Sequence, residues 1–109
     1  MVTGPVVALF SIALLAGAHP SRVKLEVARS LVAEASQIER LAAAGKLTRA
    51  YAEAIRGDLR KGLVSLQKEK ALAADVAAAL AAIDRKDATG LQAIAEKLAA
   101  EERVLGRTG

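Results

Sequence analysis

The sequence predicts an all-α protein, either an elongated antiparallel helical hairpin or a three-helix bundle, preceded by an apolar N-terminal helix. Two observations carry this prediction. Downstream of Pro20, apolar residues recur at alternating steps of three and four, which is the spacing of one face of an α-helix. Ala, Leu, Glu, Lys and Arg dominate, and the two-residue alternation of a half-buried strand is absent from the sequence. We therefore place residues 19–109 in one helical domain.

The first element is an uncharged segment at residues 1–18. From Pro5 to Ala18 it is almost purely apolar, and His19 begins a polar stretch. Three interpretations stay open. The segment is a secretory signal peptide, a retained membrane anchor, or a buried helix of a soluble bundle.

Different residues support the first two interpretations. Ala16 and Ala18 supply the small residues that a signal peptidase needs, which predicts cleavage before His19, although no Lys or Arg precedes the apolar region. As a helix, the segment would span about 27 Å, barely the hydrocarbon thickness of a bilayer. Cations at Arg22 and Lys24 would then place the remainder of the chain in the cytoplasm. We expect a cell-envelope location, exported or membrane-anchored, with the cytoplasm as the alternative.

The next expected helix covers residues 21–44. Its apolar face is formed by Ala28, Leu31, Ala35, Ile38 and Ala42. Ser21 suits the N-cap, because its side-chain oxygen can accept a hydrogen bond from a free amide of the first turn. Gly45 suits the left-handed turn that commonly follows a helix.

Residues 48–84 are predicted to form one long kinked helix, with a break near residues 68–70 as the alternative. Thr48 is a plausible cap, and the apolar face continues with Tyr51, Ile55, Leu59, Leu63, Leu66, Leu72, Val76, Leu80 and Ile83. Gly57 and Gly62 are expected to mark a bend or a close helix crossing. A final helix is predicted at residues 88–105, capped by Asp87.

Short connections between these helices favour antiparallel neighbours. Residues 71–100 contain thirteen Ala, which lets helix backbones approach closely. Tyr51 is the only aromatic residue outside the apolar segment, so burial depends on aliphatic side chains and the core is thin. We therefore expect modest stability, or help from a partner or from self-association. The chain has no Cys, which excludes disulfides and thiolate metal sites.

A basic stretch in the middle of the chain is the clearest candidate binding feature. Residues 46–70 carry seven cationic and three anionic side chains. Arg49, Arg56 and Arg60 are separated by seven and four residues and therefore share one helical face. Such an arginine stripe would neutralise the phosphates of nucleic acid or of anionic lipid headgroups. The alternative is a solvated outer face opposite the apolar stripe.

No motif in the sequence indicates catalysis, so we predict no enzyme activity, no cofactor and no metal site. His19 is the only histidine, and it has no nearby acids at the spacing that metal binding or a serine nucleophile requires. No glycine-rich phosphate loop is present. Opposite charges at helical spacing are interpreted as surface pairs that stabilise helices, namely Arg22 with Glu26, Glu53 with Arg56, and Lys97 with Glu101.

We expect a small exported or membrane-tethered helical protein that acts as a non-catalytic interaction or structural module. Its expected partner is another protein or a second copy of itself, bound through the Ala- and Leu-rich faces, and the membrane is reached through residues 1–18. The alternatives are a basic helical module that binds nucleic acid, or a helical protein that binds anionic lipids. Both alternatives use the arginine stripe.

Overall fold

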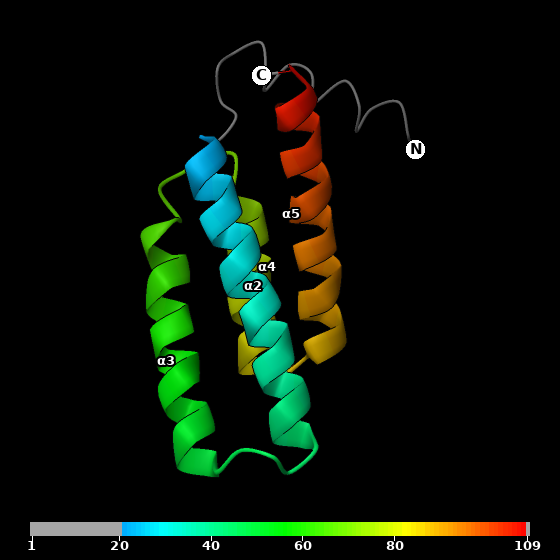
Figure 1. Cartoon of the computed structure of the whole chain (residues 1–109). Coiled ribbons are helices and arrows are strands. Elements are labelled where there is room, and N and C mark those ends of the chain that lie inside the picture. Colours follow the sequence, from blue (N-terminus) through cyan, green and yellow to red (C-terminus); the bar gives the residue numbers. More distant parts are fainter. Residues whose placement is uncertain (1–20, 109) are drawn as a thin grey trace.

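The computed structural model describes residues 21–108, and the elements in this range are α-helices. Consecutive helices run antiparallel and form an up-down-up-down bundle (Figure 1). Their bounds are α2 (Arg22–Ala43), α3 (Arg49–Ser65), α4 (Ala73–Asp84) and α5 (Ala88–Thr108). The all-α prediction is confirmed. The hairpin and the three-helix bundle are both corrected, because the described residues form four helices.

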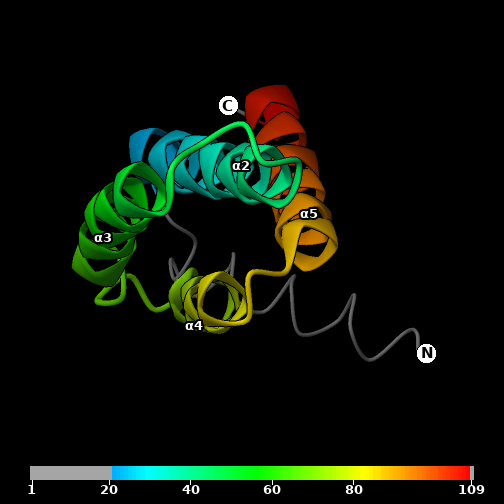
Figure 2. The same ribbon diagram turned by 90° about the horizontal axis from the view of Figure 1, so that it is seen from below.

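The four helices surround one core. Figure 2, which looks along the bundle, shows α2 and α4 on opposite sides with α3 and α5 between them. α2 packs most extensively against α5 and also contacts α3 and α4, whereas α4 contacts α3 and α5. Among the described residues, no Cα atom of α3 lies within 8 Å of one in α5, so these two helices are joined through α2 and α4.

Side-chain caps begin three of the helices, at the residues that the sequence predicts. The Lys24 amide donates to Oγ of Ser21 at 3.1 Å, and the Tyr51 amide donates to Oγ1 of Thr48 at 3.1 Å. The Gly90 amide donates to Oδ1 of Asp87 at 2.9 Å. Each cap satisfies an amide that has no partner within its own helix. Local chemistry thus fixes where α2, α3 and α5 begin.

Two helices are each followed by a residue in the left-handed backbone conformation. Two backbone hydrogen bonds close each of these helix ends. After α2, Gly45 has a φ of +73°, and the amides of Gly45 and Lys46 donate to the carbonyls of Ala42 and Leu41. After α4, Lys86 takes the same place with a φ of +56°. This arrangement is the Schellman motif, which satisfies carbonyls at a helix end. The expected turn at Gly45 is confirmed.

Replacement of Lys86 by Gly is expected to stabilise the bundle by about 0.5–1 kcal/mol, because a left-handed φ costs energy only for a residue with a Cβ atom. Urea denaturation followed by circular dichroism measures the change. The matched control is Arg85→Gly, one residue earlier, where φ is −86° and a glycine is expected to destabilise. Equal effects of the two substitutions would contradict the assignment of strain to Lys86.

The single helix predicted over residues 48–84 is wrong, and the alternative break near residues 68–70 is confirmed. Short-range backbone bonds turn the chain between α3 and α4, with the Glu69 amide on the Leu66 carbonyl and the Leu72 amide on the Glu69 carbonyl. Leu66 and Leu72 are both buried at the two ends of this turn. The chain reverses here because both leucines can then enter the same core.

The core is aliphatic and rich in alanine. Its fully buried large side chains are Leu25, Val32, Leu63, Leu72, Val76, Ile83, Leu91 and Leu98. Alanines at residues 28, 35, 79 and 82 are also buried in this core. Gly62 marks a close approach between α3 and α2, because a Cβ atom there would lie 2.9 Å from Cδ1 of Leu31. Gly57 has open space around it, so only Gly62 marks the predicted crossing.

The register of α3 differs by one residue from the prediction at the start of the helix. Tyr51 was expected on the apolar face, but 56% of it is exposed, and Ala52 is buried instead. Leu59, Leu63 and Leu66 are buried as predicted. Arg56 follows Ala52 by four residues and therefore lies on the same buried face, toward α2.

Residues 1–18, with the predicted apolar helix and the predicted cleavage site at Ala16, Ala18 and His19, lie outside the described residues. Among residues 21–108, none of the helices combines the length and the hydropathy that a membrane span requires.

Candidate functional site

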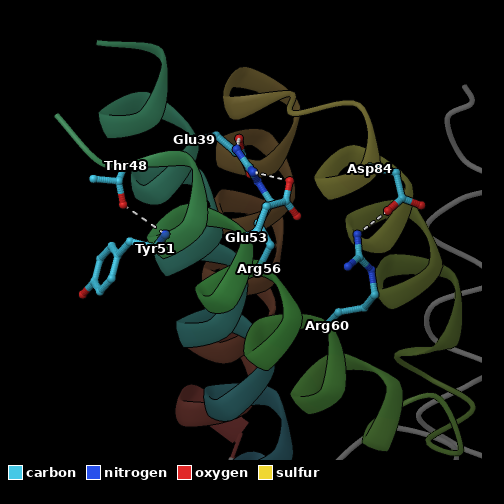
Figure 3. Close-up of polar contacts among 7 residues, drawn as sticks. All are labelled: Glu39, Thr48, Tyr51, Glu53, Arg56, Arg60 and Asp84. Carbon is cyan, nitrogen blue, oxygen red and sulfur yellow. Dashed lines mark hydrogen bonds and ion pairs between the residues drawn. The ribbon is translucent and has the colours of Figure 1, made fainter. Parts of the chain in front are cut away.

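Arg56 lies in the interface between α3 and α2, where it forms a buried ion pair (Figure 3). Its Nε and Nη2 donate to the carboxylate of Glu39 at 2.6 and 2.8 Å, and its Nη1 donates to Glu53 at 3.0 Å. Only 6% of Arg56 and 4% of Glu39 is exposed. The pair of hydrogen bonds that Arg56 donates to Glu39 raises the pKa of Arg56, which favours the charged form of the guanidinium despite its burial.

The other two arginines of the predicted stripe have different surroundings. Arg60 donates from Nη2 to Oδ1 of Asp84 and so joins α3 to α4 (Figure 3). Arg49 is exposed at the start of α3. The expectation of three cations on one open face is corrected at Arg56, which packs against α2. Anion binding by these residues stays a prediction.

Glu39 is the buried charge that sequence reasoning missed. It follows Ala35 by four residues and precedes Ala42 by three, so it belongs to the apolar face predicted for this helix. A buried carboxylate needs a partner, because an isolated charge in a core is strongly destabilising. One signal in the sequence could have identified the pair. Glu39 lies on the apolar face of one helix, and Arg56 lies on the apolar face of the next helix.

A surface hollow of about 280 Å³ lies beside this ion pair, where α2 ends and α3 begins. Its lining consists of Glu39, Ala42, Ala43, Leu47, Thr48, Arg49, Ala52, Arg56 and Lys86. The carboxylates of Glu39 and Glu53 hold Arg56. Oγ1 of Thr48 already accepts a hydrogen bond from the Tyr51 amide. Arg49 and Lys86 therefore carry the charge that this hollow offers to a ligand.

The opposite end of the bundle holds most of the surplus positive charge. We define the basic end as residues 21–29, 61–72 and 101–106, which are the start of α2, the α3–α4 turn with its preceding residues, and the last turns of α5 (Figure 1). These ranges contain seven Lys or Arg and four Asp or Glu. Residues 30–60 and 73–100 contain eight of each. Most of the net charge of +4 thus lies at one end of the fold.

Ion pairs join the elements of the basic end. Nζ of Lys24 lies 2.8 Å from Oε2 of Glu69 and ties α2 to the α3–α4 turn. Nε of Arg29 donates to Oε1 of Glu102 and ties α2 to α5. These contacts use two of the four acids at this end, so Lys61, Lys68, Lys70 and Arg103 contribute surplus positive charge.

A second hollow, of about 330 Å³, lies in the basic end between α2 and α5. Arg22, Arg29, Ala99, Glu102, Arg103 and Gly106 line it. Exposed valines occupy the same end of the bundle, with Val23 and Val27 on α2 and Val64 on α3. The basic end therefore combines a groove that contains three guanidinium groups with apolar side chains in contact with solvent.

A carboxyl group with a perturbed pKa lies where α4 meets α5. Nζ of Lys97 donates to Oδ1 of Asp75 at 2.8 Å, and this hydrogen bond raises the pKa of Lys97. Nearby, Oε1 of Glu101 is buried without a hydrogen-bond partner. Burial, followed by repulsion from Asp75, raises the pKa of Glu101. The fold therefore favours the protonated form of Glu101.

Replacement of Glu101 by Gln is expected to stabilise the protein at neutral pH by no more than about 1 kcal/mol, because the side chain is partly exposed. Since folding raises the Glu101 pKa, the stabilisation that protonation supplies is complete in acid and is lost as pH rises through the folded pKa. The gain should therefore vanish in acid. Thermal unfolding over a pH series measures this. Glu34→Gln, on an exposed face, is the control, and a gain that persists in acid would contradict this reason.

Two of the three predicted charge pairs form, but only Arg22 with Glu26 is a surface pair, because Arg56 is buried. Nε of Arg22 lies 3.9 Å from Oε1 of Glu26, and Glu53 accepts from Arg56. The third is corrected, because Lys97 pairs with Asp75 across the α4–α5 interface. Lys97 pairs with Asp75 rather than with Glu101 of its own helix, because the Asp75 carboxylate on α4 lies within hydrogen-bond distance.

Within residues 21–108, no group of three or more His, Cys, Asp and Glu side chains is arranged to hold a metal ion. Among the described residues charge gathers in four places, namely the Glu39–Arg56 pair, the hollow beside it, the basic end, and the contact of Lys97 with Asp75 near Glu101. Comparisons of the chain with protein-family models, with curated proteins and with solved structures found no match.

Proposed function

We propose that this chain is a membrane-tethered helical bundle that acts as a non-catalytic binding module at the membrane surface. One observation carries the proposal. The end of the bundle that follows directly after residues 1–20 is the basic end, which also exposes Val23, Val27 and Val64. Cations together with apolar side chains are typical of a protein surface that meets lipid headgroups.

The sequence of residues 1–18 supports a tether at this end. The segment contains no charged side chain, and the first charges after it are Arg22 and Lys24. Cations that flank an apolar segment stay on the cytoplasmic side of a membrane. The bundle would then lie in the cytoplasm, with the basic end next to the anionic lipids of the inner leaflet.

The pairing of buried charges supports binding rather than catalysis. Arg56 donates two hydrogen bonds to the Glu39 carboxylate, and Lys97 donates one to Asp75. Each pair joins two helices, α2 with α3 or α4 with α5. These groups hold the bundle together, and the exposed cations remain available for a partner.

Membrane fractionation of cells that produce the full chain tests the tether. We expect the protein in the membrane fraction after a carbonate wash, with an intact mass that includes residues 1–18. The variant Leu9→Arg/Ile12→Arg should be soluble, because charged side chains near the centre of an apolar segment oppose insertion by about 2.5–3.5 kcal/mol each.

The matched control is Ala43→Arg/Ala50→Arg, which adds the same charges at exposed positions of the bundle and should leave the protein in the membrane fraction. A soluble wild-type species that begins at His19 would contradict the tether and would support export of residues 19–109 instead.

A further inference from the structure

We propose that the basic end of the bundle binds anionic phospholipid headgroups, with lipid phosphates in the groove between α2 and α5 and the exposed valines at the acyl boundary. We draw this inference on the basis of the proposed function, because it names the surface of the tethered bundle that meets the membrane. It also names the lipid class that this surface selects.

The charge distribution favours an anionic surface as the partner. The basic end has seven cationic and four anionic side chains, whereas the rest of residues 21–100 is balanced. A cation near an anionic leaflet contributes about 1 kcal/mol to binding, so the balanced part of the bundle gains nothing comparable. The bundle is therefore expected to orient with its basic end toward the lipid.

The groove supplies a place for individual phosphates. Arg29 is held by Glu102, which fixes one wall of the groove. Arg22 extends across the groove to α5, with its Nη2 3.5 Å from the point that a Cβ atom would occupy at Gly106. Arg103 lines the groove from α5. Guanidinium groups form two parallel hydrogen bonds with a phosphate, so Arg22 and Arg103 are suited to hold one between them.

The valines give the surface its apolar component. Val23 is 70% exposed, and Val64 is 48% exposed at the end of the neighbouring helix α3. Val27 follows Val23 by one helical turn. Surface contact with nucleic acid would leave these side chains in water, whereas the interface of a bilayer covers them. Their position beside the cations therefore favours a membrane over a nucleic acid.

Depth-dependent fluorescence quenching in the full chain tests the proposal. Because the chain has no Cys, a single label is placed at the basic end by Val64→Cys or near the opposite end by Tyr51→Cys. Each labelled protein is added to vesicles of phosphatidylcholine alone, or of equal parts phosphatidylcholine and phosphatidylglycerol, that contain a nitroxide lipid. We expect strong quenching only for the label at residue 64, and only on the anionic vesicles.

A matched pair of charge variants separates the basic end from overall charge. The variant Arg22→Gln/Lys70→Gln/Arg103→Gln removes three exposed cations of the basic end, and Arg40→Gln/Lys46→Gln/Arg49→Gln removes three exposed cations elsewhere. The first should weaken binding to the anionic vesicles by about fivefold in the binding constant for each charge removed, whereas the second should leave the constant unchanged. Circular dichroism checks that both variants keep their helical content.

The outcomes distinguish this inference from the tether. Binding to both vesicles with equal quenching at residue 64 would support the tether and overturn the inference. Binding to the anionic vesicles alone would support the inference and contradict the tether. Equal effects of the two charge variants would overturn the inference, as would tighter binding to duplex DNA than to the anionic vesicles at the same phosphate concentration.

Discussion

Replacement of Arg56 by Met is expected to destabilise the bundle by about 3–5 kcal/mol, because it leaves the Glu39 carboxylate buried without a partner. A loss of this size is comparable with the whole stability of a small domain, about 5–15 kcal/mol. Urea denaturation followed by circular dichroism measures it. A single Arg60→Met substitution, which removes the more exposed pair with Asp84, should cost no more than about 1 kcal/mol.

The double variant Glu39→Met/Arg56→Met separates the cost of an unpaired charge from the value of the pair. Because both charges are removed together, its stability should lie close to that of the wild type or above it. A double variant as unstable as Arg56→Met alone would show that packing of the long side chains, rather than an unpaired charge, causes the loss.

Replacement of Leu63 by Ala is expected to cost about 2–5 kcal/mol, because the side chain is fully buried in the core. Alanines already occupy many neighbouring core positions, so few large side chains are available to fill the cavity. Thermal unfolding measures the loss. The matched control is Val64→Ala, one residue later, where 48% of the side chain is exposed and the change should stay within about 0.5 kcal/mol.

A loss below about 1 kcal/mol for Leu63→Ala would contradict a fixed core. It would indicate instead that helices so rich in alanine slide together and close the cavity. The comparison with Val64→Ala keeps the helix propensity of the new residue the same in both variants.

The starts of α2, α3 and α5 were predictable from the sequence, because their causes are local. Ser21, Thr48 and Asp87 each accept a hydrogen bond from an amide three residues later, and Gly45 takes the left-handed φ that its position requires. These interactions depend on residues within one turn of each other. Sequence reasoning therefore found them without knowledge of the fold.

The turn between α3 and α4 was only an alternative in the sequence, because nothing local requires it. It contains neither Gly nor Pro, so nothing in its sequence prevents the helix from continuing. The reversal depends on burial of Leu66 and Leu72 against helices that are distant in sequence. Periodicity alone does not reveal such a tertiary cause.

The candidate sites depended even more on the fold. The arginine stripe was predicted from spacing on one helix, but Arg56 faces a carboxylate that lies 17 residues away on another. The basic end was also hidden, since residues 21–29, 61–72 and 101–106 become neighbours only in the bundle. Sequence placed the surplus charge in the middle of the chain, at residues 46–70, but only half of that surplus lies at residues 61–70, and the fold joins it to an equal surplus at residues 21–29.

The contact between α2 and α5 has a consequence for the order of events during synthesis. α2 leaves the ribosome before the other described helices, and its most extensive contact is with α5, which leaves last. Small domains fold as units once their chain has emerged. The bundle therefore stays open until α5 has emerged, and machinery that reads residues 1–18 would meet a chain that has not yet folded.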